Sequence, residues 1–185
     1  AETHGGYSEK ETAMRRIKDI VQGQGMMEAI SYSLTSPEKA ISFTKDPKPV
    51  VEVQWPLNSS RSTMRENLLT GLVDAASYNM ARKQKELALF EQGRVYDHEN
   101  NTFNEHEHLA ALYSGHTVSA NWQHLDQKID FYFVKGQLTN LFRAIGIKDT
   151  DIEYRPEIIV GMHPTRTAGI YLNDQYVGLD RKSTV

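Results

Sequence analysis

The densest group of side chains that could do chemistry is Glu105-His106-Glu107-His108, with His98, Glu99 and Asn104 close by in sequence. Histidine and carboxylate groups are metal ligands, and two histidines separated by one residue point to the same side of a strand. A zinc site, however, needs three or four convergent ligands with supporting partners, and this segment shows only local density. We therefore predict a solvated hairpin loop here, with a metal site as the alternative.

A second candidate is His163, which is followed by Pro164 and Arg166. Proline favours turns, and no acid or base partner for the imidazole can be identified in the sequence, so we predict a structural turn rather than a polar pocket. The sequence has no phosphate loop, dinucleotide fingerprint or nucleophile elbow, and no Ser-His-Asp set can be singled out. It therefore predicts no catalytic, cofactor-binding or metal-binding residue.

Hydrophobic spacing predicts three helices that would position any such side chains. The first follows Ser8, which forms a capping-box pattern with Glu11, and it ends at Gly23. The second runs from Ser62 to about Lys85, and the third from Asp130 to Ile145.

Two features of the second predicted helix leave alternatives open. Gly71 costs about 1 kcal/mol relative to alanine in a helix, so it indicates either a close approach by a neighbouring helix or a merely tolerated glycine. Arg82, Lys83 and Lys85 complement the negative carboxyl end of the helix. We predict a solvated cap there, with RNA contact as the alternative.

Period-two alternation predicts strands at 29–34, 51–55, 87–96, 109–114, 152–154, 167–172 and 175–177. The polar segment 97–108 is predicted to be a long hairpin loop, and Asn173-Asp174 a tight turn. Helices and strands do not alternate as βαβ units. The sequence therefore predicts an α+β fold, with an antiparallel sheet flanked by helices.

The composition limits the class of protein. A chain of 185 residues suits one α+β unit, and no apolar run approaches the ~20 residues that a bilayer crossing needs, so we expect no membrane partner. The formal charge of −3 argues against binding nucleic acid by electrostatics alone. The chain has no cysteine, and its polar start lacks the apolar core of a secretory signal, which fits a cytoplasmic location.

Several short segments, in order along the chain, carry a resemblance to a known family. They are Gly25-Met-Met-Glu28-Ala-Ile-Ser-Tyr32-Ser33-Leu34, Pro56-Leu57-Asn58, Ser62-Thr-Met64-Arg65-Glu-Asn-Leu68-Leu69-Thr-Gly71-Leu72, Leu89-Phe90-Glu91-Gln-Gly93-Arg94-Val95-Tyr96, His108-Leu-Ala110 with Ser114-Gly115, Trp122, Asp130-Phe131 with Lys135-Gly136, and His163-Pro164 with Arg166 and Ala168. The series resembles the catalytic-like core of the phenylalanyl-tRNA synthetase β subunit, a class II aminoacyl-tRNA synthetase fold.

The resemblance implies an α2β2 heterotetramer in which the α subunit holds the active site. The β core would pack against that subunit and contribute helices to a bundle at the interface, while other β domains handle editing and RNA. ATP, magnesium and tRNA(Phe) would then belong to the complete enzyme, and this chain would hold no cofactor.

The resemblance also implies that the chemistry has been lost from this chain. Class II synthetases bind the ATP α-phosphate through an arginine, in a sequence like Gly-Arg-Val-Tyr-Arg, whereas Gly93-Arg94-Val95-Tyr96 is followed here by Asp97. A carboxylate repels phosphate where a guanidinium is needed. The glycine-rich third motif with its arginine is also missing, so we expect no adenylate formation.

Boundaries follow from where the resemblance holds. Residues 1–10 are expected to be the end of a preceding linker, 11–178 the core, and 179–185 a divergent or vector-derived tail. The run His163-Pro164-Thr165-Arg166-Thr167-Ala168 departs from the family's His-Pro-Gly-Arg-Ser-Ala.

Three functions remain open at this stage. The leading one is an interaction domain whose helices at 8–23 and 62–85 carry apolar residues beyond those the core needs, so that the isolated chain self-associates. The alternatives are a stand-alone class II-like domain that binds a small molecule, and direct RNA binding, for which no basic stripe with interleaved aromatic residues is present.

Overall fold

The computed structural model describes residues 5–118, 127–159, 162 and 167–181. The helices of this part are α1 (Glu9–Gly23), α2 (Pro37–Ile41), α3 (Leu69–Met80) and α4 (Phe131–Ala144), with the short 3-10 turns η1 (Ser59–Arg61) and η2 (Asp149–Asp151). The strands are β1 (Met27–Glu28), β2 (Leu34–Thr35), β3 (Thr63–Met64), β4 (Leu87–Glu99), β5 (Thr102–Ser114), β6 (His116–Val118), β7 (Gln127–Lys128), β8 (Ile152–Pro156), β9 (Thr167–Leu172) and β10 (Gln175–Arg181).

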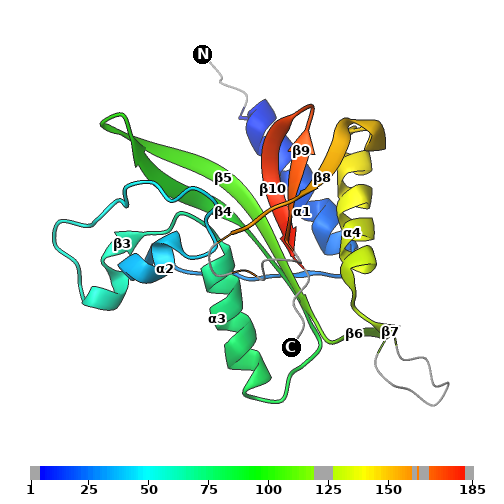
Figure 1. The fold of residues 1–185 in the computed structure, drawn as a ribbon, viewed down its shortest axis with the longest axis horizontal. Coiled ribbons are helices and arrows are strands. Elements are labelled where there is room, and N and C mark those ends of the chain that lie inside the picture. The colour runs from blue at the N-terminus through cyan, green and yellow to red at the C-terminus, as the bar shows by residue number, and fades with distance from the viewer. Residues whose placement is uncertain (1–4, 119–126, 160–161, 163–166, 182–185) are drawn as a thin grey trace.

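A three-stranded sheet of order β1-β4-β5 separates two apolar layers (Figure 1). On one face Phe90 packs with Val21 of α1 and Leu141 of α4. On the other face Leu87 and Leu89 pack against α3. Successive residues of β4 thus serve opposite layers, as the alternation of a strand requires.

Most of the remaining pairing is antiparallel. The strands β8, β9 and β10 form a second, antiparallel sheet, and β2 with β3 and β6 with β7 form antiparallel pairs. In the first sheet, β1 pairs with β4 in parallel. The predicted fold class, α+β with helices flanking antiparallel strands, is confirmed. In the part of the chain that the structure describes, no helix is long and apolar enough to cross a membrane.

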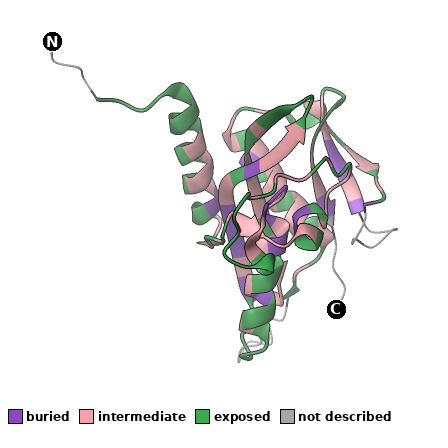
Figure 2. Cartoon of the chain, turned by 90° about the vertical axis from the view of Figure 1, so that its left-hand side faces the viewer, coloured by how far each residue is buried: buried purple, intermediate pink, exposed green. Residues whose placement is uncertain are grey.

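The predicted ends of the first and third helices are confirmed. The Ser8 hydroxyl accepts a hydrogen bond from the Glu11 N–H, and the Glu11 carboxylate accepts one from the Ser8 N–H, which is the capping box. Asp130 caps α4 by accepting a hydrogen bond from the Phe133 N–H. Along α1 most residues are exposed, and Val21 is its one buried residue (Figure 2).

The predicted helix at 62–85 is too long. Thr63 and Met64 are extended, because they pair with β2, and α3 begins only at Leu69. Its start is set by Asn67, whose side-chain oxygen accepts hydrogen bonds from the N–H groups of Leu69 and Thr70. At the other end Lys83 adopts φ 68°, which a helix cannot accommodate.

The predicted loop at 97–108 is wrong. Strands β4 and β5 continue in register to the pair Glu99 and Thr102, and Asn100 and Asn101 form a two-residue turn with φ of 51° and 59°. Positive φ at both central residues gives the hairpin turn that matches strand twist, and asparagine tolerates it. The segment is polar because this hairpin arm projects into solvent, rather than because it is a loop.

Two other predicted strands are largely irregular. Of 29–34 only Leu34 lies in a strand, since the Ser31 N–H and hydroxyl both donate to Glu91 instead of to a strand neighbour. Of 51–55 only Glu52 makes a bridge, to Thr63.

The carboxyl-terminal strands follow the prediction more closely. Strand β9 is confirmed, as is the turn at Asn173 and Asp174, with φ of 48° and 65°. Strand β10 extends to Arg181, so residues 179–181, which the sequence assigned to a tail, pair with β9.

Candidate functional site

A buried ion pair lies on the α3 side of the central sheet. The Arg65 Nη1 donates to Glu91 Oε1 at 2.6 Å and to Ser31 Oγ at 2.9 Å, and the Arg65 Nε donates to the Arg94 carbonyl at 2.9 Å. The Ser31 hydroxyl donates in turn to Glu91 Oε2 at 2.6 Å. The side chains of Arg65 and Glu91 are only 7% and 3% exposed, so these bonds replace water almost completely.

Two glycines make room for this cluster. A Cβ on Gly71 would lie 2.3 Å from Ser31 Oγ, and a Cβ on Gly93 would lie 2.6 Å from Arg65 Nη2. The close approach to Gly71 therefore comes from the irregular segment after β1, and not from a neighbouring helix.

The cluster joins three of the segments that carried the family resemblance. Ser31 belongs to the first, Arg65 and Gly71 to the run before and within α3, and Glu91 and Gly93 to β4. Sequence reasoning missed their role, although the signal was present: residues far apart in the chain shared one family pattern. The arrangement holds the segments in register, and no described group in it is free to react.

Farther along the same face of β4 lies Asp97, at the place where the resemblance implied loss of a phosphate-binding arginine. Its carboxylate accepts a hydrogen bond from Asn104 Nδ2 at 2.8 Å and lies 3.0 Å from His106 Nε2. The Asn104 bond, helped by the charges of Lys48 and His106, lowers the pKa of Asp97. The position is therefore anionic at neutral pH.

Two further carboxylates border Asp97. Lys48 Nζ pairs with Glu99 at 2.5 Å, and the neighbouring Glu66 is buried. Burial, reinforced by the charge of Asp97, raises the pKa of Glu66. Glu66 Oε1 has no hydrogen-bond partner among the described residues. Lys48 balances the charge of Glu99, and the fixed carboxylate of Asp97 remains to repel a phosphate group at this place.

Of the four residues 105–108, His106 and His108 lie on this face, whereas Glu105 and Glu107 lie on the other. His106 and His108 share the Asp97 side of β5, with ring centroids 6.4 Å apart. On the opposite side Arg94 pairs with Glu105 at 3.0 Å and with Glu107 at 3.2 Å. Within the described ranges, no three histidine, aspartate or glutamate side chains are placed to hold a metal ion. The run 163–166 and Trp122 lie outside the described residues.

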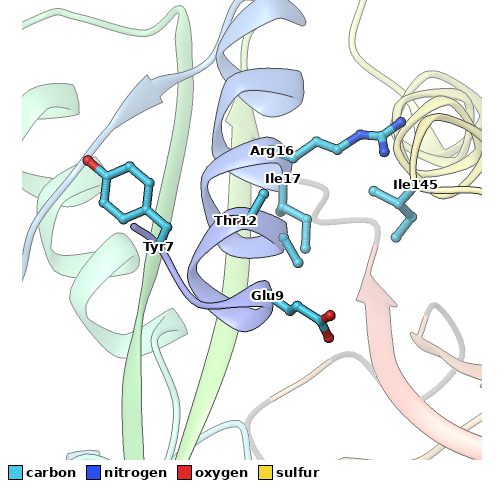
Figure 3. A pocket seen from close by; sticks show the side chains of 7 residues that line it. Tyr7, Glu9, Thr12, Arg16, Ile17 and Ile145 are labelled. Carbon is cyan, nitrogen blue, oxygen red and sulfur yellow. The ribbon is translucent and has the colours of Figure 1, made fainter. Parts of the chain in front are cut away.

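A surface hollow of about 460 Å³ lies between α1 and the carboxyl end of α4 (Figure 3). Its wall consists of Tyr7, Glu9, Thr12, Ala13, Arg16, Ile17 and Ile145. Arg16 reaches across to donate to the Ala144 carbonyl at 2.6 Å, which satisfies the end of α4. Glu9 and Arg16 are its charged side chains, and it has no set of groups that could form an acid, base and nucleophile.

Comparison with known sequences gives a consistent result. The family model described as the phenylalanyl tRNA synthetase beta chain CLM domain matches residues 1–179. The phenylalanine-tRNA ligase beta subunit of Lactobacillus johnsonii is 93% identical over 179 residues, which are 97% of this chain and 22% of that protein. The corresponding subunits of Lactobacillus acidophilus and Streptococcus pyogenes serotype M1 are 75% and 38% identical, over 97% and 89% of this chain and 22% and 21% of those proteins. The chain thus spans about a fifth of the length of these relatives.

Solved structures show the same fold at low sequence identity. A pyrrolysyl tRNA synthetase of Desulfitobacterium hafniense has a TM-score of 0.57 and 16% identity, covering 89% of this chain and 55% of that one. An ATP phosphoribosyltransferase regulatory subunit/histidyl-tRNA synthetase of Bacillus halodurans has a TM-score of 0.59 and 13% identity, covering 83% and 38%. The architecture is that of class II aminoacyl-tRNA synthetases, and the chain belongs to the phenylalanyl tRNA synthetase beta chain CLM domain family.

Proposed function

We propose that this chain is the non-catalytic core of the β subunit of a phenylalanine-tRNA ligase. In the complete enzyme it would assemble with the catalytic α subunit, as an α2β2 tetramer, for the ATP-dependent charging of tRNA(Phe) in the cytoplasm. ATP and magnesium would bind to the α subunit, and tRNA(Phe) would be held through the complete enzyme. The family match supports the assignment to the β subunit of the ligase. The negative charge of Asp97 on β4 supports the absence of catalytic activity.

One observation carries the non-catalytic part of this proposal. Asp97 stands on β4 where the catalytic pattern has an arginine, and Asn104 and His106 hold its carboxylate in place. Adenylate formation builds negative charge on the α-phosphate in the transition state, and a fixed carboxylate raises that barrier where a guanidinium would lower it. Lys48 balances the charge of Glu99, and burial raises the pKa of Glu66, so Asp97 is the carboxylate that provides this repulsion.

The sequence-based expectation of no catalytic and no cofactor-binding residue becomes part of the proposal. The two features that could suggest ligand chemistry are the Asp97 face and the hollow beside α4. The Asp97 face is negatively charged and would repel a nucleotide. The hollow has no acid, base and nucleophile that point towards one another.

Phenylalanine-dependent pyrophosphate exchange tests the proposal. A β subunit that contains this chain should give no exchange without the α subunit, and full exchange when the two are combined. Activity of the β subunit alone would contradict a non-catalytic role. Asp97→Asn in the β subunit, which removes the charge and keeps the shape, should leave exchange by the combined subunits unchanged.

Assembly is tested separately by co-purification. A tagged β subunit should retain the α subunit on a column in stoichiometric amount. If the α subunit passes through, assembly is not the role of this chain, whatever the exchange assay shows.

A further inference from the structure

The segment 42–48, which follows α2, is attached to both of the larger sheets. Lys45 Nζ pairs at 2.8 Å with Oε1 of Glu157, the residue after β8. Three residues further along the chain, Lys48 Nζ pairs with Glu99 of β4 at 2.5 Å. We call residues 42–48 the strap, because its two lysines hold carboxylates that belong to different sheets.

The Lys45 end of the strap is enclosed by groups of the second sheet. Lys45 Nζ also donates to the Tyr171 hydroxyl at 3.2 Å and lies 4.7 Å from the centroid of the Tyr176 ring. The side chains of Lys45 and Glu157 are only 29% and 16% exposed. A Cβ on Gly169 would lie 2.7 Å from Glu157 Cγ, so this glycine makes room for the glutamate against β9. The contact is therefore more enclosed than an ordinary surface ion pair, which contributes little.

The beginning of the strap is fixed to the start of α3. Asn67 Nδ2 donates to the Ser42 carbonyl at 2.5 Å and to Thr44 Oγ1 at 3.3 Å. Between these two contacts Phe43 adopts φ 64°, which is unfavourable for a bulky side chain. Such a conformation persists only where the surrounding contacts enforce it. Pro47 restricts the backbone between the two lysines. The strap is thus held in one conformation.

The strap joins two sheets that the apolar core does not join. Among the described residues, neither of the two buried apolar clusters includes a residue of β8, β9 or β10. The second sheet is tied to α4 and to the turn after it, because Lys135 Nζ lies 4.6 Å from the Tyr154 ring centroid and Arg143 pairs with Asp149. These ties are local in the chain. Lys45, in contrast, lies 112 positions from Glu157.

We infer that the strap couples the second sheet to the hairpin arm of β4 and β5 that carries Asp97. The charge of Lys48 is one of those that stabilise the Asp97 carboxylate, so the far end of the strap acts directly on this arm. A displacement of the second sheet moves Lys45, and a strap held in one conformation passes the displacement on to Lys48. Packed and hydrogen-bonded contacts in an unbroken series carry such coupling. This inference does not depend on the proposed function.

Hydrogen exchange of the full-length β subunit that contains this chain, followed by mass spectrometry of its peptides, tests the coupling. Lys45→Met keeps the apolar stem of the side chain and removes its charge. Exchange should become about tenfold faster in β9 and β10, where the contact is lost, and about threefold faster in the arm 97–108, which the substitution does not touch. Arg143→Met is the matched control, because it breaks an ion pair beside the second sheet without touching the strap. It should leave exchange in the arm unchanged.

Lys48→Met tests the same coupling from the other end. Because coupling between two sites is reciprocal, this variant should speed exchange in the arm and, about threefold, in β9 and β10. If each lysine variant changes only the sheet that it touches, the strap holds the sheets separately and the inference is wrong. Equal acceleration in all peptides, including those of α1, would indicate loss of global stability and would also overturn it, as would no change at all. The proposed function is unaffected by any of these results.

Discussion

Arg65 and Glu91 illustrate how much of this fold rests on single side chains. Their pairing takes both charges out of water. Ser31 and the Arg94 carbonyl form part of the other hydrogen bonds that these two side chains can make. A buried pair of this kind contributes modestly as a whole, because desolvation offsets the attraction. Removing one partner is a different matter, since the other charge remains buried without compensation.

We therefore predict a large effect from a single substitution. Arg65→Met should reduce the free energy of unfolding by about 3–5 kcal/mol, because it leaves the Glu91 carboxylate buried and unpaired. Urea denaturation measures the change. The double variant Arg65→Met/Glu91→Leu should recover part of the loss, whereas simple additivity of the two single variants would show that the pair is not coupled.

The two carboxyl groups beside Lys48 should respond to pH in opposite directions. Burial raises the pKa of Glu66, so its protonated form is favoured in the folded state, and its contribution to stability is lost as the pH rises through the raised pKa. The Asn104 hydrogen bond lowers the pKa of Asp97, so its contribution is present above the ordinary carboxyl pKa and is lost as the pH falls.

Replacing each carboxyl group by its amide should reveal how that group changes the stability of the protein with pH. Relative to the wild type, Glu66→Gln should gain stability as the pH rises above about 4.3, the ordinary pKa of a glutamate, whereas Asp97→Asn should lose stability as the pH rises towards about 3.9, the ordinary pKa of an aspartate. Urea unfolding of the three proteins at several pH values measures both. Parallel pH profiles for the two variants would contradict the environments described for these groups.

Among the elements, α3 depends on one residue just before its first turn. Asn67 Nδ2 donates to the Ser42 carbonyl at 2.5 Å, while its Oδ1 accepts the hydrogen bonds that cap α3. The side chain thus joins the segment after α2 to the start of the helix. A serine side chain at this place would be too short to do both.

Asn67→Ala should consequently cost about 1–2 kcal/mol, through the lost cap and the unpaired carbonyl. Asn67→Ser should retain the cap and lose about half as much. Thermal unfolding gives both values, and Asn140→Ala, on the exposed side of α4, is the control that should stay within about 0.5 kcal/mol of the wild type. Equal losses for the alanine and serine variants would contradict a capping role.

Elements with local signals could be predicted from the sequence, and elements formed by distant contacts could not. The capping box at Ser8 and the cap at Asp130 lie within one turn of the residues they bind, so spacing revealed α1 and α4. The start of the second helix was wrong because Thr63 and Met64 pair with β2, a contact with residues about 30 positions earlier in the chain. Likewise the polar arm 97–108 had no apolar alternation, because neither of its faces meets a core along most of its length.

The same division holds for the candidate site. Asp97 could be found because a family pattern gives that position an arginine, and its charge can be read from the sequence. Its partners could not be found, since Asn104 and His106 meet it only through the register of a hairpin that the sequence presented as a loop. The Arg65 and Glu91 pair joins residues 26 positions apart, and neither has a local partner that would reveal it.

At the scale of the whole molecule, several large apolar side chains of the described residues are exposed. They include Ile30, Tyr32, Trp55 and Leu57 on irregular segments, and Val73, Tyr78 and Met80 on α3. Apolar surface of this extent lowers the free energy of any contact that covers it, at about 25 cal/mol per Å² before the entropic costs of association. A chain separated from its partner has only copies of itself to provide that contact.

We therefore predict that the isolated chain of 185 residues self-associates in a concentration-dependent way. Sedimentation equilibrium between about 1 and 100 μM should show the mean mass rising above the monomer value of 21.1 kDa. Leu57→Asp should shift this equilibrium towards monomer by about tenfold, because a charge at the centre of an apolar contact must be desolvated without a partner. Phe103→Asp should not shift it. A wild-type chain that remains monomeric at the highest concentration would show that its exposed apolar surface is too divided to form an interface by itself.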